Sequence, residues 1–209
     1  MPASPLPTDT STAFGPDSAA PWRRCFLALA PDTATRDALA AAPLPASVQA
    51  AAPDDLHLTL AFLGAVTPAQ GQSLIQALPH LARKLPPLPF QHNATWPNTD
   101  APRVEVACYA FAPELQALLS DTHAVLRQLG LPIEARPFRP HVTLGRYPRH
   151  ATPVAGQQPA ILMPPTARFT AIGLYTSLRH TASQPESLPP DTDQTHARPH
   201  YFLMAHHEL

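Results

Sequence analysis

Two short segments of this chain have the same order of residue types. Each places a histidine two residues before a threonine, with aliphatic residues between and after them. In a β-strand, side chains at positions i and i+2 lie on one face while those at i+1 and i+3 lie on the other. The pattern therefore predicts that each histidine shares a surface with its threonine, and that the aliphatic residues anchor the strand in the core. The two segments are Leu56-His57-Leu58-Thr59-Leu60 and Pro140-His141-Val142-Thr143-Leu144.

If the two strands meet across a cleft, two imidazoles and two hydroxyls face one another. A neutral imidazole can take a proton from water, and an imidazolium can give one to a departing oxygen. Histidine's unperturbed pKa of roughly 6.5 makes both forms available near neutral pH. A phosphoryl transition state needs in-line placement and charge stabilisation more than covalent help. The residue types therefore favour metal-free phosphoryl chemistry with His57, Thr59, His141 and Thr143 as the site.

The elements around these segments repeat in two halves. Strands are expected at 23–29, 56–63, 90–96, 103–109, 139–146, 168–175 and 200–204, and helices at 35–42, 67–85 and 113–130. Each half runs strand, helix, strand around one His-x-Thr segment. The pattern predicts an α+β protein of two pseudo-symmetric lobes, each an antiparallel sheet with flanking helices, around a central cleft.

The rest of the chain indicates the domain boundaries, the kind of substrate and the cellular location. Residues 1–21 read as a disordered tail, 22–209 as a single bilobal domain, and the polar, proline-rich stretch 181–199 as a flexible insertion. The formal net charge is −1, so a nucleic-acid substrate would have to be gripped locally. Cys25 and Cys108 sit in apolar stretches and are expected to be buried free thiols. Without a signal peptide or a membrane-length apolar run, a cytoplasmic protein is expected.

The segments 55–64 and 136–146 resemble the two signatures of the two-histidine phosphoesterases. The resemblance is strongest to the RNA 2′,3′-cyclic phosphodiesterase branch, historically called 2′-5′ RNA ligases, and it extends from about Cys25 to Tyr175. It implies that His57 is the proton donor, that His141 is the proton acceptor, and that both threonines bind phosphate oxygens. It also implies an RNA 3′ end or a small cyclic nucleotide as substrate, with no cofactor and no metal. A monomer is expected.

Five further residues are candidates for substrate binding: Arg139, Arg146, Phe62, Trp96 and Tyr175. Strand alternation puts Arg139 on the face of His141 and Arg146 on the opposite face, unless a turn at Gly145 changes the parity. Arg146 also falls where the family signature carries an arginine. Phe62 and Trp96 could stack a terminal base, although the core is the simpler place for Phe62. Tyr175 lies in a stretch that is similar to an edge strand of the family.

The function expected first is hydrolysis of a 2′,3′-cyclic phosphate to a 2′-phosphate. The same site would also serve a 2′-5′ oligonucleotide phosphodiesterase, a reversible 2′-5′ ligase or a hydrolase of ADP-ribose cyclic phosphate. A non-catalytic nucleotide-binding module is disfavoured because both motifs keep their histidine and threonine. A metalloprotein with His57 and His141 as ligands is disfavoured because the sequence shows no third and fourth ligand.

Overall fold

The computed structural model describes residues 21–149, 164–177 and 201–209. The expected insertion at 181–199 lies outside these ranges, as does the expected N-terminal tail apart from Pro21. Three α-helices and one short 3-10 helix are present in the described ranges: α1 (Thr33–Ala40), η1 (Pro53–Asp55), α2 (Pro68–Leu81) and α3 (Pro113–Gln128). The strands there are β1 (Trp22–Pro31), β2 (Gln49–Ala50), β3 (Leu58–Val66), β4 (Leu88–Trp96), β5 (Val104–Tyr109), β6 (His141–Arg146), β7 (Thr166–Ala167), β8 (Phe169–Ser177) and β9 (Tyr201–Glu208).

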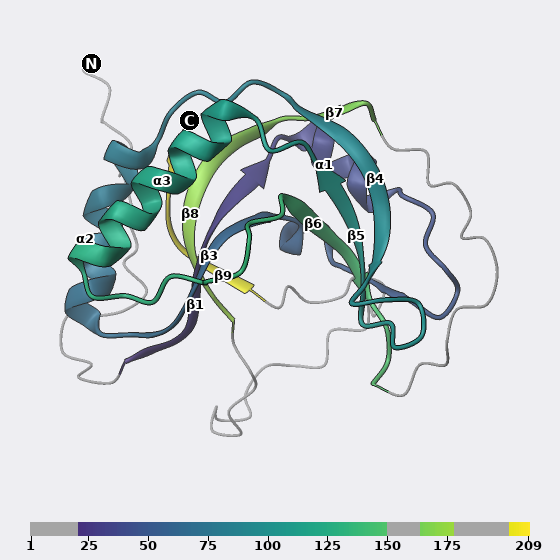
Figure 1. The fold of residues 1–209 in the computed structure, drawn as a ribbon, viewed down its shortest axis with the longest axis horizontal. Coiled ribbons are helices and arrows are strands. Elements are labelled where there is room, and N and C mark those ends of the chain that lie inside the picture. Colours follow the sequence, from purple (N-terminus) through teal and green to yellow (C-terminus); the bar gives the residue numbers. More distant parts are fainter. Residues whose placement is uncertain (1–20, 150–163, 178–200) are drawn as a thin grey trace, which may run out of the picture.

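These nine strands form one antiparallel sheet, which curves strongly across the molecule (Figure 1). The order is β7-β4-β5-β6-β3-β1-β8-β9, with β2 paired to the remaining edge of β6. The two strands that carry the His-x-Thr segments, β3 and β6, are therefore neighbours at the centre of the sheet. They share a single pair of opposed residues, Leu58 and Val142, and both side chains are fully buried.

This narrow seam divides the sheet into a group of five strands, β7-β4-β5-β6 with β2 on β6, and a group of four, β3-β1-β8-β9. The α+β class and the antiparallel pairing are as predicted. The lobes are not the two halves of the sequence, however, because β8 and β9 come from the C-terminal part of the chain and join β1 and β3. The strand expected at 168–175 is present as β8, but the edge position expected for the stretch around Tyr175 is wrong, since β8 lies between β1 and β9 and is paired on both sides. β1 is ten residues long and pairs along most of the nine residues of β8, whereas β6 is only six residues long.

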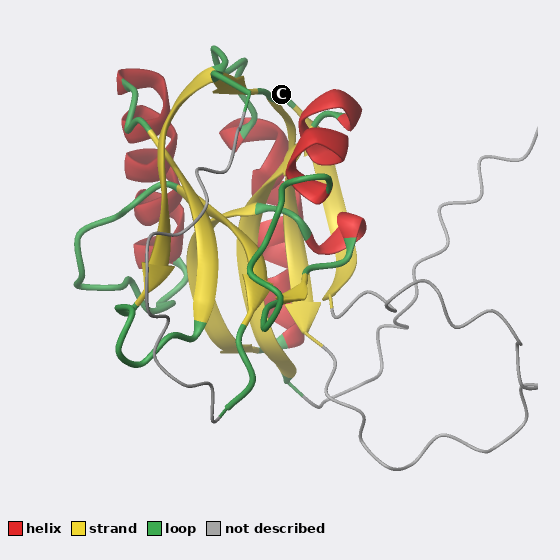
Figure 2. Ribbon diagram, turned by 90° about the vertical axis from the view of Figure 1, so that its right-hand side faces the viewer, coloured by secondary structure: helices red, strands yellow, loops and turns green. Residues whose placement is uncertain are grey.

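Helices α1 and α2 begin where the side chains of capping residues satisfy amide groups of the first turn. The Asp32 side chain accepts a hydrogen bond from the Thr35 amide at 2.8 Å, and Thr67 and Gln70 form a capping box at the start of α2. Helix α2 buries leucines at helical spacing and packs against β8, β9 and α3. Figure 2 shows helices on both sides of the sheet. Among the described residues no helix is long and apolar enough to cross a membrane.

Helix α2 ends at Leu81 rather than near residue 85 as expected. Ala82 has extended backbone angles, and the next leucine, Leu85, is buried in the core. The predicted boundary followed the leucine spacing alone, whereas the chain turns away to begin β4.

Candidate active site

His57 lies between η1 and β3, where the backbone holds its ring. Its Nδ1 is 2.6 Å from the Asp55 carbonyl oxygen. Because a carbonyl oxygen only accepts hydrogen bonds, Nδ1 carries the proton and donates it to Asp55. Phe26 and Tyr201 pack against the same ring, with centroid separations of 4.8 and 5.1 Å. His57 is therefore fixed in one tautomer, with Nε2 left for proton transfer.

His141 is held in the same way at the start of β6. Its Nδ1 donates to the Arg139 carbonyl oxygen at 2.7 Å, and the Trp96 ring lies 4.5 Å from its own, centroid to centroid. In both segments the acceptor is thus the carbonyl two residues before the histidine. The two rings present the same nitrogen, Nε2, for chemistry.

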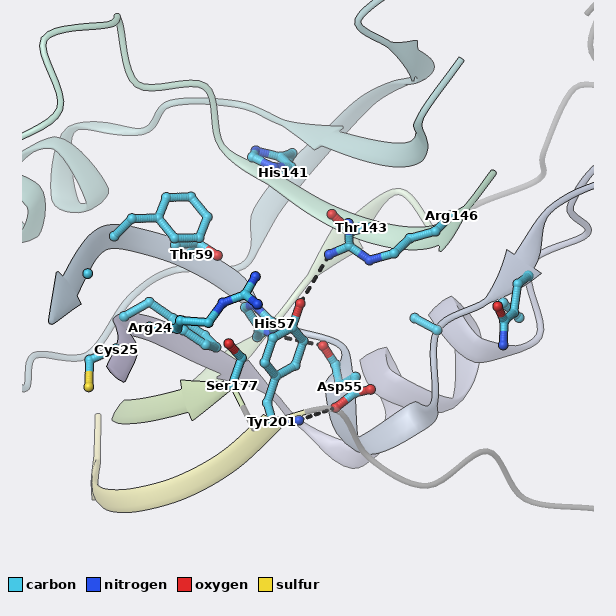
Figure 3. Close-up of a pocket in the computed structure, with 16 residues that line it drawn as sticks. Arg24, Cys25, Asp55, His57, Thr59, His141, Thr143, Arg146, Ser177 and Tyr201 are labelled. Atoms are coloured by element: carbon cyan, nitrogen blue, oxygen red, sulfur yellow. Dashed lines mark hydrogen bonds between the residues drawn. The ribbon is translucent and has the colours of Figure 1, made fainter. Parts of the chain in front are cut away.

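Both histidines and both threonines of the motifs line one cleft of about 700 Å³. Figure 3 shows His57 and Thr59 on one wall, and His141 and Thr143 on the other. The four side chains are half-buried, while Leu58, Leu60, Val142 and Leu144 between and after them are buried. The predicted division of each segment into a cleft face and a core face is therefore present. The structure brings together the four residues that the motifs single out.

Burial controls the charge of the two imidazoles in the free protein. Desolvation lowers the pKa of His57 from 6.5 to about 4, against the opposing effect of the hydrogen bond to Asp55. The pKa of His141 is lowered as well, mainly by burial, with a further contribution from the positive charge of Arg139. Both rings are consequently neutral near pH 7 in the free protein.

Arg146 lies in the cleft, where simple alternation from His141 does not place it. On β5, Val106 and Glu105 are consecutive, but their partners on β6 are Thr143 and Gly145. Leu144 is thus an extra residue, a β-bulge, and it shifts the parity of every residue after it. The bulge brings the guanidinium of Arg146 to the catalytic side, where it donates to the Tyr201 hydroxyl oxygen at 3.0 Å.

Phe62 occupies the corresponding position of the other segment, five residues after the histidine. Leu27 and Ala28 of β1 pair with Ala61 and Thr59, so Leu60 is an extra residue on β3. This bulge stands directly after the motif threonine, as Leu144 does on β6. Phe62 is 60% exposed and lines the cleft, so the core position considered for it is wrong. Equivalent bulges therefore deliver an aromatic ring from one lobe and a cation from the other.

The remaining candidates flank the two histidines. The guanidinium carbon of Arg139 lies 4.3 Å from the centroid of the Trp96 ring, and both residues line a second hollow that also touches His141. Tyr175 does not line the cleft. Its ring stacks on Phe26 and lies 5.9 Å from the His57 ring, so it supports the wall behind that histidine.

The sequence did not single out Asp55 and Tyr201, although together they complete the His57 wall. The Asp55 carbonyl orients His57, while its carboxylate accepts the Tyr201 amide at 3.2 Å. Tyr201 begins β9, so this contact brings a remote part of the chain onto the site. Its ring packs edge-on against His57, and its hydroxyl meets Arg146. A local sequence pattern cannot predict this contact, because 146 residues separate Asp55 from Tyr201.

Arg24 is a second cation of the cleft that the sequence left unassigned. Its φ of +56° is in the left-handed region, an unusual conformation for arginine. The register of β1 is irregular here, between Trp22 and Cys25, and the Thr176 hydroxyl donates to the Arg23 carbonyl at 2.6 Å. This local geometry turns Arg24 into the cleft, which it lines together with His57 and Ser177 (Figure 3).

Cys25 also borders the cleft, but its chemistry is suppressed. Burial raises the pKa of its thiol to about 11, so the thiol stays protonated at neutral pH. Cys25 and Cys108 are both buried and free, as predicted. In the part of the chain that the structure describes, no group of three or more histidine, cysteine or acidic residues could hold a metal ion.

Comparison with known proteins points to one family. The model of the LigT-like phosphoesterases matches residues 31–106. The chain is 34% identical over 95 residues to an RNA 2′,3′-cyclic phosphodiesterase of Geobacillus stearothermophilus and 32% identical over 96 residues to one of Bacillus subtilis. These matches cover 44% and 45% of this chain. They cover only 30% and 52% of the two relatives, so the match spans about half of those proteins or less.

Solved structures match over nearly the whole chain. LigT of Escherichia coli in complex with 3′-AMP has a TM-score of 0.63 at 24% identity, covering 90% of this chain and 98% of that one. A protein of Thermus thermophilus has a TM-score of 0.60 at 24% identity, covering 89% and 97%. This likeness shows a shared fold, while the residues that the family model matches include the first His-x-Thr segment on β3. In residues 31–106 the chain is therefore similar to the LigT-like phosphoesterases, and over nearly its whole length it shares the fold of the solved LigT structure.

Proposed function

We propose that the chain hydrolyses 2′,3′-cyclic phosphates at RNA ends or on nucleosides, and that the products are 2′-phosphates. One observation carries the proposal: two imidazoles, each fixed by an Nδ1–H bond to the carbonyl two residues earlier, share one cleft with two threonine hydroxyls. The proposal is further supported by the curated relatives, which are named RNA 2′,3′-cyclic phosphodiesterases.

The reaction needs one proton taken and one proton given. Nε2 of His141 accepts a proton from water as the water oxygen bonds to phosphorus. The bond from phosphorus to the ribose 3′ oxygen breaks, and Nε2 of protonated His57 gives that oxygen its proton. The phosphate remains on the 2′ oxygen. Exchange of protons with solvent then returns both imidazoles to their starting states.

The electrostatics of the cleft are consistent with these two proton transfers. Burial disfavours the charged form of His57, so once protonated its ring releases the proton readily, as a general acid should. The negative charge of a bound phosphate favours protonation of a nearby imidazole, which supplies the acid only when substrate is present. Arg24 and Arg146 line the cleft as cations, and in this proposal the hydroxyls of Thr59 and Thr143, which also line it, donate to phosphate oxygens.

Product analysis tests the proposal. Purified protein is incubated with adenosine 2′,3′-cyclic phosphate and excess EDTA, and the products are separated by chromatography. The proposal predicts adenosine 2′-phosphate. Adenosine 3′-phosphate as the product would overturn the assignment of the leaving oxygen. Binding of the nucleotide without turnover would overturn catalysis and favour a nucleotide-binding module.

A further inference from the structure

A second hollow, of about 810 Å³, opens from the catalytic cleft. Thr59, Phe62 and His141 line both spaces, so the two meet at the reacting groups. The second hollow lies between β3, the end of β4 and the segment that leads into β6. Its volume falls in the range of roughly 300–1,000 Å³ that is typical of ligand sites.

The lining of this hollow combines aromatic rings with arginines. Among the described residues, four aromatic residues and three arginines border it: Phe62, Trp96, Phe111, Phe138, Arg103, Arg136 and Arg139. The one acidic residue among its described lining, Glu134, forms an ion pair with Arg136. The hollow thus carries an excess of positive charge, in a chain whose formal net charge is −1.

Two of the arginines retain donors for a ligand. Arg139 lies over the Trp96 ring, and no described acidic residue forms an ion pair with it. Arg103 is exposed and uses one nitrogen to donate to the Arg149 carbonyl, which leaves most of its five N–H groups free of that bond. A planar ring beside cations is the arrangement with which proteins bind single-stranded nucleic acid, by stacking the bases and pairing the phosphates.

The covalent structure of the proposed substrate indicates which part of it could bind in the second hollow. In a terminal cyclic phosphate, the phosphate is joined to one ribose only, and that ribose also carries the base and the 5′ phosphodiester. When the cyclic phosphate lies between the two histidines, the base and the 5′ strand must leave the junction in different directions. Two spaces that meet at the junction provide those directions.

We infer that the second hollow binds the nucleotide on the 5′ side of the terminal one, so that an RNA strand binds more tightly than a free nucleotide. The base of that nucleotide stacks on Trp96 and Phe62, and its phosphodiester pairs with Arg139 and Arg103. This assignment rests on the proposed function, because it takes the reactive phosphate to lie between His57 and His141.

Titration calorimetry with short RNAs tests the inference without turnover. The ligands are oligoadenylates of one, two and three nucleotides that end in a 2′-phosphate. The wild-type protein should bind the dinucleotide at least about tenfold more tightly than the mononucleotide, as expected for one stacked base and one paired phosphate. Arg103→Ala should remove most of this gain. It should also reduce the slope of log affinity against log salt for the dinucleotide by about 0.7, the value for one lost phosphate contact on a single strand.

Lys84→Ala is the matched control. Lys84 is an exposed cation between α2 and β4 that lines neither space, so its removal changes the net charge equally. The control variant should keep the full gain from one to two nucleotides. A wild-type protein that binds both lengths equally would overturn the inference. So would a loss in Lys84→Ala as large as that in Arg103→Ala, because the gain would then reflect bulk charge.

The same experiment separates this inference from the proposed function. A protein that shows the length-dependent gain but fails to hydrolyse cyclic phosphates would support the second hollow and refute the hydrolase. A protein that hydrolyses adenosine 2′,3′-cyclic phosphate but shows no gain with length would support the hydrolase and refute the second hollow.

Discussion

Replacing His57 by glutamine should make the stability of the protein less sensitive to acid. The pKa of His57 is about 4 in the folded protein and about 6.5 in an unfolded chain. Between pH 4 and pH 6.5, His57 is protonated in most unfolded molecules but neutral in most folded ones. The free energy of unfolding therefore falls as the pH drops from 6.5 towards 4, and glutamine, which does not titrate, removes that contribution.

The size of the effect follows from the shift. Each pKa unit corresponds to about 1.4 kcal/mol, so the full contribution of His57 is about 3 kcal/mol, most of which is lost by pH 4.5. Urea unfolding of wild type and His57→Gln at pH 7.5 and at pH 4.5 measures it. Between the two pH values the free energy of unfolding should fall by about 2–3 kcal/mol more in the wild-type protein than in the variant.

The double difference cancels the titrating groups that do not interact with His57, and the pH-independent cost of the substitution itself. His80→Gln, at an exposed position near the end of α2, is the matched control, and its unfolding free energy should change between the two pH values as much as that of the wild type. Equal acid sensitivity of wild type and His57→Gln would refute the conclusion that burial holds this imidazole neutral.

Three further predictions concern catalysis. Thr59→Val and Thr143→Val keep the side-chain shape but delete a donor to the phosphate, and each should lower kcat by about tenfold to a hundredfold while the urea midpoint stays near that of wild type; loss of activity only through unfolding would argue for a structural role. Tyr201→Phe removes the hydroxyl that accepts a hydrogen bond from Arg146 and should raise KM severalfold. Arg146→Lys loses the planar fork of donors and should raise KM more than Tyr201→Phe does. The reverse order of KM values in steady-state assays would contradict the role given to Arg146. The profile of kcat/KM against pH should be a bell with its maximum below pH 6.5, because one imidazole must be protonated and burial lowers the pKa of both; a maximum above pH 7.5 would contradict those shifts.

The motif residues were predictable from sequence because their argument needs only the period of a strand. His57 and Thr59 share a face, as do His141 and Thr143, while the leucines and valine between them are buried. A cysteine in an apolar run could likewise be placed in the core, as Cys108 is. These inferences depend on local geometry, which the order of residue types encodes directly.

Residues beyond the bulges could not be placed in that way. Counting by two from His141 puts Arg146 on the wrong face, because Leu144 is an extra residue that only the pairing with β5 reveals. The same holds for Phe62 after Leu60 on β3. A bulge depends on the partner strand, so a single strand read in isolation gives no warning of it.

Long-range pairing accounts for the other difference. The repeat of elements along the chain favoured lobes made from sequence halves, yet β8 and β9 complete the lobe that β1 and β3 begin. The contact between Asp55 and Tyr201 arises from this exchange, and it places a C-terminal tyrosine on the His57 ring. β1 pairs with β3 on one side and with β8 on the other. The choice of β8 depends on the relative stability of all possible strand pairings, so it cannot be predicted from a short segment.

The central claim is that His57 and His141 act together as acid and base, and the turnover of histidine variants tests it most directly. Initial rates are measured with adenosine 2′,3′-cyclic phosphate in excess EDTA for wild type, His57→Ala, His141→Ala and the double variant, with His80→Ala as the control. Each single variant should lose about 10²–10⁴-fold in kcat, and the double variant should be little slower than either, because the two imidazoles work as one unit. The control should match the wild type. Full activity in either single variant would contradict the account.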